Sequence, residues 1–247
     1  MATYDGMRAL VTGGGSGIGA ATARLLREGG AQVACLDLDP SGAPEGCRQV
    51  VGDVSDPGVS LAVEQAVADL GGLDVLVNNA GVGAAGTVED SDDDEFRRLH
   101  EVNVLGTVRV TRAALPALRD SSSAVVVNTC SVAAQVGLPQ RAAYSASKGA
   151  VLSLTLAMAA DHLADGVRVC AVAPGTADTP WVQRLLDASD DPAAERSALE
   201  ARQPIGRLVS PEEVAETICF LASPRSGSAT GTVVTVDGGL SYLRLPR

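Results

Sequence analysis

Short runs of apolar and β-branched residues alternate along the chain with longer segments whose apolar positions recur at helical spacing. Several of the short runs are continuously apolar, which is typical of strands that helices cover on both faces. The predicted strands are residues 8–11, 32–38, 49–51, 75–78, 124–129, 167–172 and 233–236. The predicted helices between them are residues 18–28, 57–70, 92–119, 144–164 and 211–221.

This alternation of strands with helices predicts right-handed βαβ units. We therefore expect an α/β fold, a Rossmann-type doubly wound parallel sheet of about seven strands with helices on both faces, in one domain over residues 1–247. Ser91 precedes an acidic run and is expected to cap one helix, and Ser210 with Glu213 predicts a capping box on another. Residues 179–207 are too long for an ordinary loop, so we expect a lid over a ligand site.

Charge and composition narrow the possible partners. The 19 basic residues against 30 acidic residues leave a net charge of -11, which argues against a nucleic-acid or anionic-membrane binder. The longest mainly apolar stretch, residues 150–160, is too short to span a bilayer. The five cysteines form no CxxC pair and the two histidines have no partner at ligand spacing. We therefore expect reduced thiols in a cytoplasmic protein and no metal site.

A glycine-rich segment, residues 12–19 with the sequence TGGGSGIG, follows the first strand and leads into a helix. Backbone without side chains can approach a pyrophosphate there, and the helix N-terminus supplies N–H donors. Asp37 ends the second predicted strand, where a carboxylate can accept hydrogen bonds from the adenosine ribose and repel a 2′-phosphate. No basic residue lies beside it in sequence, so NAD is favoured over NADP as cofactor. The alternative for Asp37 is a solvated loop acid.

Tyr144 and Lys148 are four residues apart, which places both side chains on one face of a helix. A nearby ammonium favours the phenolate form of a tyrosine and so suits it to proton transfer. Lys148 is the single lysine among the 19 basic residues. Taken alone, such a pair is more often a simple surface pair of a helix.

With these motifs together, the chain resembles the short-chain dehydrogenase/reductase family over nearly its whole length. The resemblance rests on the glycine segment, Asp53-Val54, residues 78–81 (NNAG), Asn103, Ser131, the Tyr144 and Lys148 pair, and Pro174-Gly175. Within the family, the segments around residues 174–180 and 202–207 are similar to those of cytosolic 3-hydroxybutyrate-type and 2-keto-3-deoxy-sugar-acid dehydrogenases.

The resemblance implies a catalytic set of four residues. Tyr144 would act as general acid/base on the substrate oxygen, and Ser131 would hydrogen-bond that oxygen. Lys148 would hold the nicotinamide ribose, and Asn103 would anchor a water that relays protons. Ser131 as the cap of a turn and Asn103 as a hydrogen-bonding residue inside a helix are the alternatives.

The resemblance also implies the residues that bind NAD. Asp53 would bind the adenine amino group, and Asn79 with its neighbours would line the adenosine side. The expected cofactor-binding residues are Gly13, Ser16, Gly17, Ile18, Gly19, Asp37, Asp53, Val54, Asn79, Ala80, Gly81, Tyr144, Lys148, Pro174, Gly175, Thr176 and Thr179. The implied reaction is hydride transfer between a secondary alcohol and the nicotinamide.

Three arginines give an indication of the substrate's charge. Arg141 lies one helical turn before Tyr144, and Arg184 and Arg202 fall within the expected lid. If they converge on one pocket they would bind a carboxylate, which predicts a small hydroxy acid as substrate. The alternative is that they pair with the many lid acids at the surface. Trp181 is expected either to close over the nicotinamide or to anchor the lid.

Two further interpretations stay open: a dehydrogenase of a neutral polyol, sugar or cyclic alcohol, and a non-catalytic NAD-binding protein. The helix at 144–164 is apolar around much of its circumference and needs a second burial partner. In the family this helix and the helix at 92–119 form a dimer interface, and a second interface near the C-terminus makes a tetramer. We therefore expect a homotetramer that acts on a small-molecule substrate, without nucleic acid or membrane.

Overall fold

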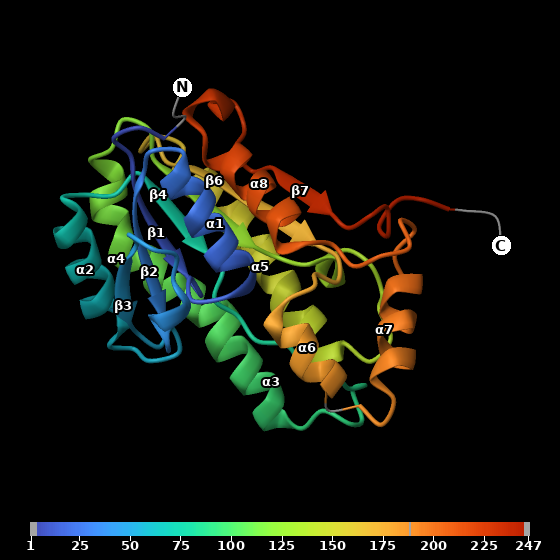
Figure 1. Cartoon of the computed structure of the whole chain (residues 1–247). Coiled ribbons are helices and arrows are strands. Elements are labelled where there is room, and N and C mark those ends of the chain that lie inside the picture. Colours follow the sequence, from blue (N-terminus) through green and yellow to red (C-terminus); the bar gives the residue numbers. More distant parts are fainter. Residues whose placement is uncertain (1–3, 188, 245–247) are drawn as a thin grey trace.

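One parallel sheet holds the seven predicted strands in the computed structural model, which describes residues 4–187 and 189–244 (Figure 1). Hydrogen-bonded neighbours follow the order β3-β2-β1-β4-β5-β6-β7. The order reverses between β1 and β4, and ligands of such sheets bind beyond the carboxyl ends of the strands at this reversal. The strands are β1 Arg8–Thr12, β2 Gln32–Asp37, β3 Arg48–Val51, β4 Val75–Asn78, β5 Val125–Thr129, β6 Arg168–Pro174 and β7 Val233–Val236.

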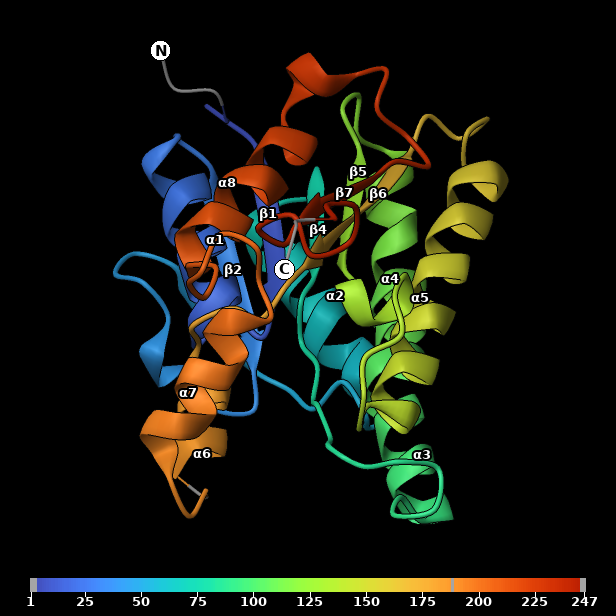
Figure 2. The same cartoon turned by 90° about the vertical axis from the view of Figure 1, so that its right-hand side faces the viewer.

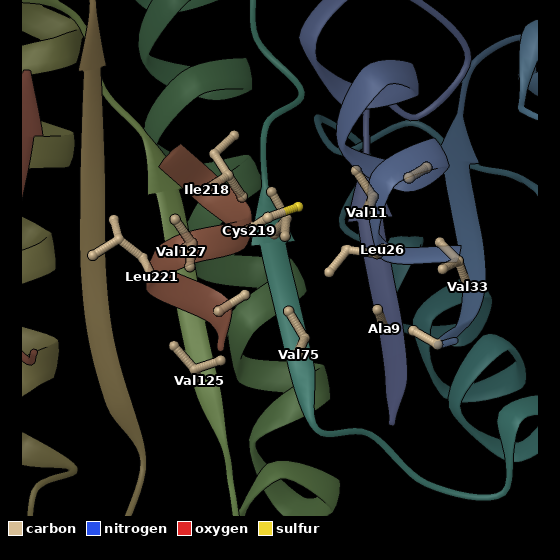
Figure 3. Packing of buried hydrophobic residues seen from close by; sticks show 14 of the residues in the cluster. Ala9, Val11, Leu26, Val33, Val75, Val125, Val127, Ile218, Cys219 and Leu221 are labelled. Carbon is tan, nitrogen blue, oxygen red and sulfur yellow. The ribbon is translucent and has the colours of Figure 1, made fainter. Parts of the chain in front are cut away.

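Helices cover both faces of the sheet, as the continuous apolar strands predict. The helices are α1 Gly17–Glu28, α2 Val59–Leu70, α3 Asp93–His100, α4 Gly106–Arg119, α5 Ala142–Asp161, α6 Pro180–Asp187, α7 Pro192–Ala201 and α8 Pro211–Ala222. Side chains of α1 and α8 bury one face, where Leu26 and Ile218 lie over Val75 and Val127 (Figure 3). Side chains of α2, α4 and α5 bury the other face.

The predicted helix over residues 92–119 is interrupted in the structure. A π-helical turn at Glu101–Leu105 separates α3 from α4 and contains Asn103. Such a turn inserts an extra residue, which the spacing of apolar positions does not reveal, and it often marks a functional site. The expected cap is also corrected: Asp92, not Ser91, accepts the backbone N–H of Glu95 at 2.8 Å.

Other element boundaries differ by a few residues from the prediction. Helix α5 spans Ala142–Asp161 instead of 144–164, α2 begins at Val59 instead of Pro57, and β6 continues to Pro174 instead of ending at 172. The capping box on α8 is confirmed, because Ser210 and Glu213 exchange side-chain-to-backbone hydrogen bonds.

Residues 179–207, predicted as a lid, contain two helices, α6 and α7. Both stand beyond the carboxyl ends of the strands in two perpendicular views (Figures 1 and 2). Val182 and Leu186 of α6 pack with Leu199 of α7 and Leu208 in a small apolar cluster of their own. The segment therefore has a small apolar core of its own and lies beyond the carboxyl ends of the strands. Among all the helices of the described chain, none is long and apolar enough to cross a membrane.

Candidate active site

Two adjoining cavities open at the carboxyl ends of the central strands. The first, of about 210 Å³, is lined by Ser131, Tyr144 and Lys148, and we call it the tyrosine cavity. The second, of about 470 Å³, is lined by the glycine loop and Asp37, and we call it the glycine-loop cavity. The residues that line both cavities are Ile18, Asn79, Gly81, Val82, Thr179 and Trp181. An elongated ligand can therefore extend from one cavity into the other.

The glycine loop owes its shape to close backbone packing. Gly13 has a φ of +65°, in the region that glycine adopts without strain. A Cβ at Gly19 would lie 2.0 Å from the Gly13 carbonyl oxygen, so only glycine fits there. Asn79, directly after β4, holds the loop in place, because its Nδ2 donates to the Thr12 carbonyl at 3.1 Å.

Thr12 is a positioning residue that was not assigned from the sequence. Its Oγ1 accepts the backbone N–H groups of Asn79 and Ala80, each at 3.0 Å. The hydroxyl therefore ties the end of β1 to the segment after β4 that lines the cavities. The available signal was its place directly before the glycine run.

The N-terminus of α1 opens toward the glycine-loop cavity. Gly13, Ser16 and Gly17 line that cavity, and the first turn of α1 holds no acidic residue. Within the described residues, the Ser16 side chain makes no capping hydrogen bond. The N–H groups of this turn and the positive end of the helix dipole are therefore free to bind an anion such as a phosphate.

Two acids and an unforeseen arginine line the same cavity. The Asp37 carboxylate accepts the Gly15 N–H at 2.9 Å, which fixes it against the glycine loop. Asp53 accepts both the N–H and the hydroxyl of Ser55. Arg98 reaches the cavity from α3. Arg98 and Asp37 are far apart in the sequence, so their place in one cavity could not be predicted from it.

The Tyr144 and Lys148 pair faces the tyrosine cavity, as predicted from the spacing. The Lys148 Nζ lies 5.9 Å from the centre of the Tyr144 ring and donates to the Thr129 carbonyl at 2.8 Å. Lys148 is 5% exposed, so its ammonium is held in place among protein atoms. Ser131 lines the cavity and also caps a short turn by accepting the Ala133 N–H at 3.2 Å. The two expectations for Ser131 are thus compatible.

Asn103 connects three parts of the site from the π-helical turn. Its Oδ1 accepts the Val82 N–H at 2.9 Å, and its Nδ2 donates to the Val82 carbonyl and to the Ser147 hydroxyl, each at 3.0 Å. The Ser147 hydroxyl donates to the Tyr144 carbonyl at 2.8 Å. Asn103 therefore fixes the segment after β4 relative to the helix that carries Tyr144. Ser147 is a second positioning residue that sequence reasoning missed.

Two of the three predicted arginines meet in the tyrosine cavity. Arg141 and Arg202 line it together with Tyr144. Burial lowers the pKa of the Arg141 guanidinium from its usual value, and the charge of Arg202 lowers it further. Neither arginine forms an ion pair with any acid of residues 4–187 and 189–244. The alternative of ion pairs with lid acids is therefore not seen for these two arginines, and the charge of Glu195 only partly offsets the lowered pKa of Arg141.

Arg184 does not join them, which corrects the expectation that all three arginines converge on one pocket. It lines the glycine-loop cavity instead. The reason is helical geometry: Arg184 and Leu185 are neighbours on α6, so their side chains point in different directions, and Leu185 is the one that lines the tyrosine cavity.

The lid packs against the rest of the site at two points. A Cβ at Gly83 would lie 2.5 Å from the Trp181 ring, so the indole rests on bare backbone. Gln203, which is 1% exposed, donates from Nε2 to the carbonyls of Thr176 and Arg207. Gln203 thereby joins the end of the lid to the Pro174-Gly175-Thr176 segment that lines the tyrosine cavity. The resemblance of the segment 202–207 was the available signal, but it assigned no role to Gln203.

Comparison with known proteins decides the family. The model of the family described as enoyl-(acyl carrier protein) reductase matches residues 13–241. The chain belongs to the short-chain dehydrogenase/reductase family. The sequence-based resemblance is therefore confirmed, and the chain is an oxidoreductase that acts on CH–OH groups.

Named relatives of this short-chain dehydrogenase/reductase act on different alcohols. It is 40% identical to 2-(S)-hydroxypropyl-CoM dehydrogenase 3 of Xanthobacter autotrophicus, over 94% of this chain and 96% of the relative. It is 42% identical to cis-4-hydroxycyclohexanecarboxylate dehydrogenase of Sinomonas cyclohexanicum, over 94% of this chain and 95% of the relative. The solved structure of Thermoplasma acidophilum aldohexose dehydrogenase superimposes with a TM-score of 0.91 at 32% identity, over 99% of this chain and 98% of that chain.

Short-chain dehydrogenases use nicotinamide cofactors, and the residues of the glycine-loop cavity fit one. The uncapped N-terminus of α1 suits a pyrophosphate, and the Asp37 carboxylate suits ribose hydroxyls. Gly81 allows a close approach: a Cβ there would crowd the Asn103 Oδ1 at 3.0 Å and lie 3.4 Å from the Lys148 Nζ. Glycine at this position therefore lets the backbone that lines both cavities pack against Asn103 and Lys148.

Proposed function

We propose that the protein is an NAD-dependent dehydrogenase of a small hydroxy acid. The observation that carries the proposal is the pair Arg141 and Arg202, which line the tyrosine cavity beside Tyr144 and form no ion pair with an acid among the described residues. Two adjacent guanidinium groups repel each other, and a substrate carboxylate between them would relieve that repulsion. The general activity, oxidation of an alcohol or reduction of a ketone, follows from the family.

NAD is the proposed cofactor because of Asp37. Its carboxylate faces the glycine-loop cavity and would repel a 2′-phosphate while it accepts hydrogen bonds from a ribose. The first turn of α1 would hold the pyrophosphate, Asp53 the adenine, and Lys148 the nicotinamide ribose. Arg184, which lines this cavity, is assigned to the cofactor side and not to the substrate.

The catalytic roles follow the positions of the polar groups in the tyrosine cavity. The bound nicotinamide would supply the two-electron acceptor for the hydride that leaves the carbinol carbon. Tyr144 takes the hydroxyl proton of the alcohol in oxidation and returns it in reduction. Ser131 hydrogen-bonds the substrate oxygen as it becomes a ketone. Lys148 places a fixed positive charge beside Tyr144, and Asn103 holds the local backbone and a relaying water.

The runner-up is a dehydrogenase of a neutral polyol, sugar or cyclic alcohol. The similarity to an aldohexose dehydrogenase structure favours it. The hydroxycyclohexanecarboxylate dehydrogenase relative favours the acid, because its named substrate carries a carboxylate. The intact Tyr144, Lys148 and Ser131 set argues against a non-catalytic NAD-binding protein.

We also propose that residues 179–207 act as the substrate lid and that the protein is a cytoplasmic homotetramer. Leu156 on α5 and Phe220 on α8 leave 48% and 62% of their surfaces exposed, and both helices offer apolar area to a second copy. Size-exclusion chromatography with light scattering tests the assembly. A monomeric mass would contradict it.

The deciding experiment is NADH production by the purified protein with NAD, on matched panels of hydroxy acids and neutral alcohols. Activity on the acids that exceeds activity on the neutral analogues supports the arginine site. Activity confined to the neutral alcohols returns Arg141 and Arg202 to a structural role and favours the runner-up. Activity with NADP but not NAD would contradict the role given to Asp37.

A further inference from the structure

Apolar side chains form the walls of the tyrosine cavity beyond its reactive groups. They come from separate parts of the chain: the turn after β5, the loop before α5, both lid helices and the loop after β7. These wall residues are Val132, Leu138, Leu185, Leu199 and Leu240. A substrate lying between the arginines and Tyr144 therefore contacts hydrocarbon on several sides.

The polar side chains of this cavity already have partners or assigned roles. In the described chain, no aspartate, glutamate, glutamine or histidine side chain lines the cavity. Asn79 is the one amide there, but its Nδ2 donates to the Thr12 carbonyl and its Oδ1 accepts the Thr129 hydroxyl. Lys148 donates to the Thr129 carbonyl. Proteins recognise the vicinal hydroxyls of sugars with carboxylate and amide groups, and such groups are not available here.

We infer that the substrate is a hydroxy acid with an apolar carbon skeleton, cyclic or branched, and not a polyhydroxylated sugar acid. This inference rests on the proposed function, because it assumes that Arg141 and Arg202 take the carboxylate. The hydroxyl that is oxidised is met by Ser131 and Tyr144. Each additional hydroxyl would be buried against hydrocarbon without a partner, and such a loss lowers turnover about tenfold to a hundredfold.

Three compounds with one ring test the inference: 4-hydroxycyclohexanecarboxylate, 3,4,5-trihydroxycyclohexanecarboxylate, and 4-hydroxycyclohexanecarboxamide as the neutral analogue. The measured quantity is kcat/KM for NADH formation by the full-length protein. The expected result is a value for the monohydroxy acid at least tenfold above that for the trihydroxy acid. Equal values, or a preference for the trihydroxy acid, would overturn the inference.

The carboxamide separates this inference from the proposed function. If the carboxamide reacts as fast as the acid, the arginine site fails, whatever the trihydroxy acid does. If none of the three is oxidised, binding of cyclohexanecarboxylate and of the trihydroxy acid to the enzyme with NADH is measured by calorimetry. Cyclohexanecarboxylate must bind at least tenfold more tightly, and failure to do so overturns the inference.

A wall substitution makes the test specific to the cavity. Leu138 is half-buried in the loop before α5, so Leu138→Asn places an amide at the wall without opening the core. The ratio of kcat/KM for the trihydroxy acid over the monohydroxy acid is expected to rise at least fivefold. Leu163→Asn, at an exposed leucine outside the cavity, is the matched control and leaves the ratio unchanged. An unchanged ratio in Leu138→Asn contradicts the contact between this wall and the substrate.

Discussion

Arg141 and Arg202 lie close enough together that, after burial, the charge of Arg202 is the next cause that lowers the pKa of Arg141. Arg141 directly precedes the first residue of α5, and Arg202 follows the last residue of α7. The residue before Arg141, Gln140, has a left-handed φ of 54°, which is unusual for a residue other than glycine. Two repelling charges and a strained approach are costs to the folded chain, and such costs are typical of functional sites.

Replacement of either arginine should act selectively on acid substrates. Arg202→Ala and Arg141→Ala are each expected to lower kcat/KM for a hydroxy acid at least tenfold, about 1.4 kcal/mol, while kcat/KM for a neutral alcohol changes little. Arg225→Ala, at an exposed arginine away from the cavity, is the control. A fall of less than about threefold for the acid, which is under about 1 kcal/mol, would show that the carboxylate does not bind there.

Loss of the Tyr144 hydroxyl should abolish turnover without unfolding the protein. Tyr144→Phe removes the proton donor and acceptor and is expected to lower kcat by about a hundredfold to ten-thousandfold. NAD binding, measured by calorimetry, should stay within about threefold, because the ring and Lys148 stay in place. Tyr242→Phe, at an exposed tyrosine, should leave kcat unchanged. Substantial activity in Tyr144→Phe would assign proton transfer to another group.

Asp37→Asn separates the charge of the carboxylate from its hydrogen bond. The amide oxygen still accepts the Gly15 N–H, but the negative charge that would repel a 2′-phosphate is gone. The ratio of kcat/KM for NADP over NAD is expected to rise about tenfold or more. If Arg98 attracts the added phosphate, Asp37→Asn with Arg98→Ala reverses part of that gain. No change in the ratio in Asp37→Asn would remove Asp37 as the discriminating residue.

The ion pair of Arg8 and Asp74 should make stability depend on pH in acid. Burial alone would raise the pKa of Asp74, but hydrogen bonds from Arg8 and Ser121 outweigh it and lower that pKa below its usual value. A lowered pKa in the folded state means that the carboxylate stabilises the protein above about pH 4 and that this stability is lost as the pH falls through the folded-state pKa.

Asp74→Asn is therefore expected to lower the free energy of unfolding at pH 7 by about 1–3 kcal/mol. The difference from the unmodified protein should shrink as the pH falls below about 4, as urea titrations at several pH values would show. Asp69→Asn, in a more exposed pair with Arg48 at 4.0 Å, should change stability by less than about 1 kcal/mol. A pH-independent difference would contradict the role of the Asp74 charge.

Gln203 should matter for cofactor binding although no role of its own could be assigned to it from the sequence. Gln203→Leu removes the hydrogen bonds to the Thr176 and Arg207 carbonyls, and the freed segment at Gly175-Thr176 should raise KM for NAD about threefold to thirtyfold. Gln203→Glu keeps the size of the side chain but loses the donating amide, so it should also raise KM for NAD. A lower melting temperature with an unchanged KM for NAD would indicate a purely structural residue.

Local sequence signals were sufficient for the sheet and for much of the site. Short apolar and β-branched runs placed all seven strands, most clearly the central ones, whose residues helices bury on both faces. The spacing of Tyr144 and Lys148 placed them on one helix, and both line one cavity. Helix boundaries were less accurate. The π-helical turn at Asn103 depends on hydrogen bonds to Val82 and Ser147, which are distant in the sequence.

The α/β class, the strands, the glycine loop and the family could be assigned from the residues alone, because each is marked by a periodicity or a motif within short segments. Which arginines share a cavity became clear only from the folded chain. Arg202 lines the tyrosine cavity with Arg141, whereas Arg184 of α6 and Arg98 of α3 line the glycine-loop cavity. Those placements depend on how the lid helices and α3 pack beyond the strand ends, and such packing joins residues whose separation along the chain carries no signal.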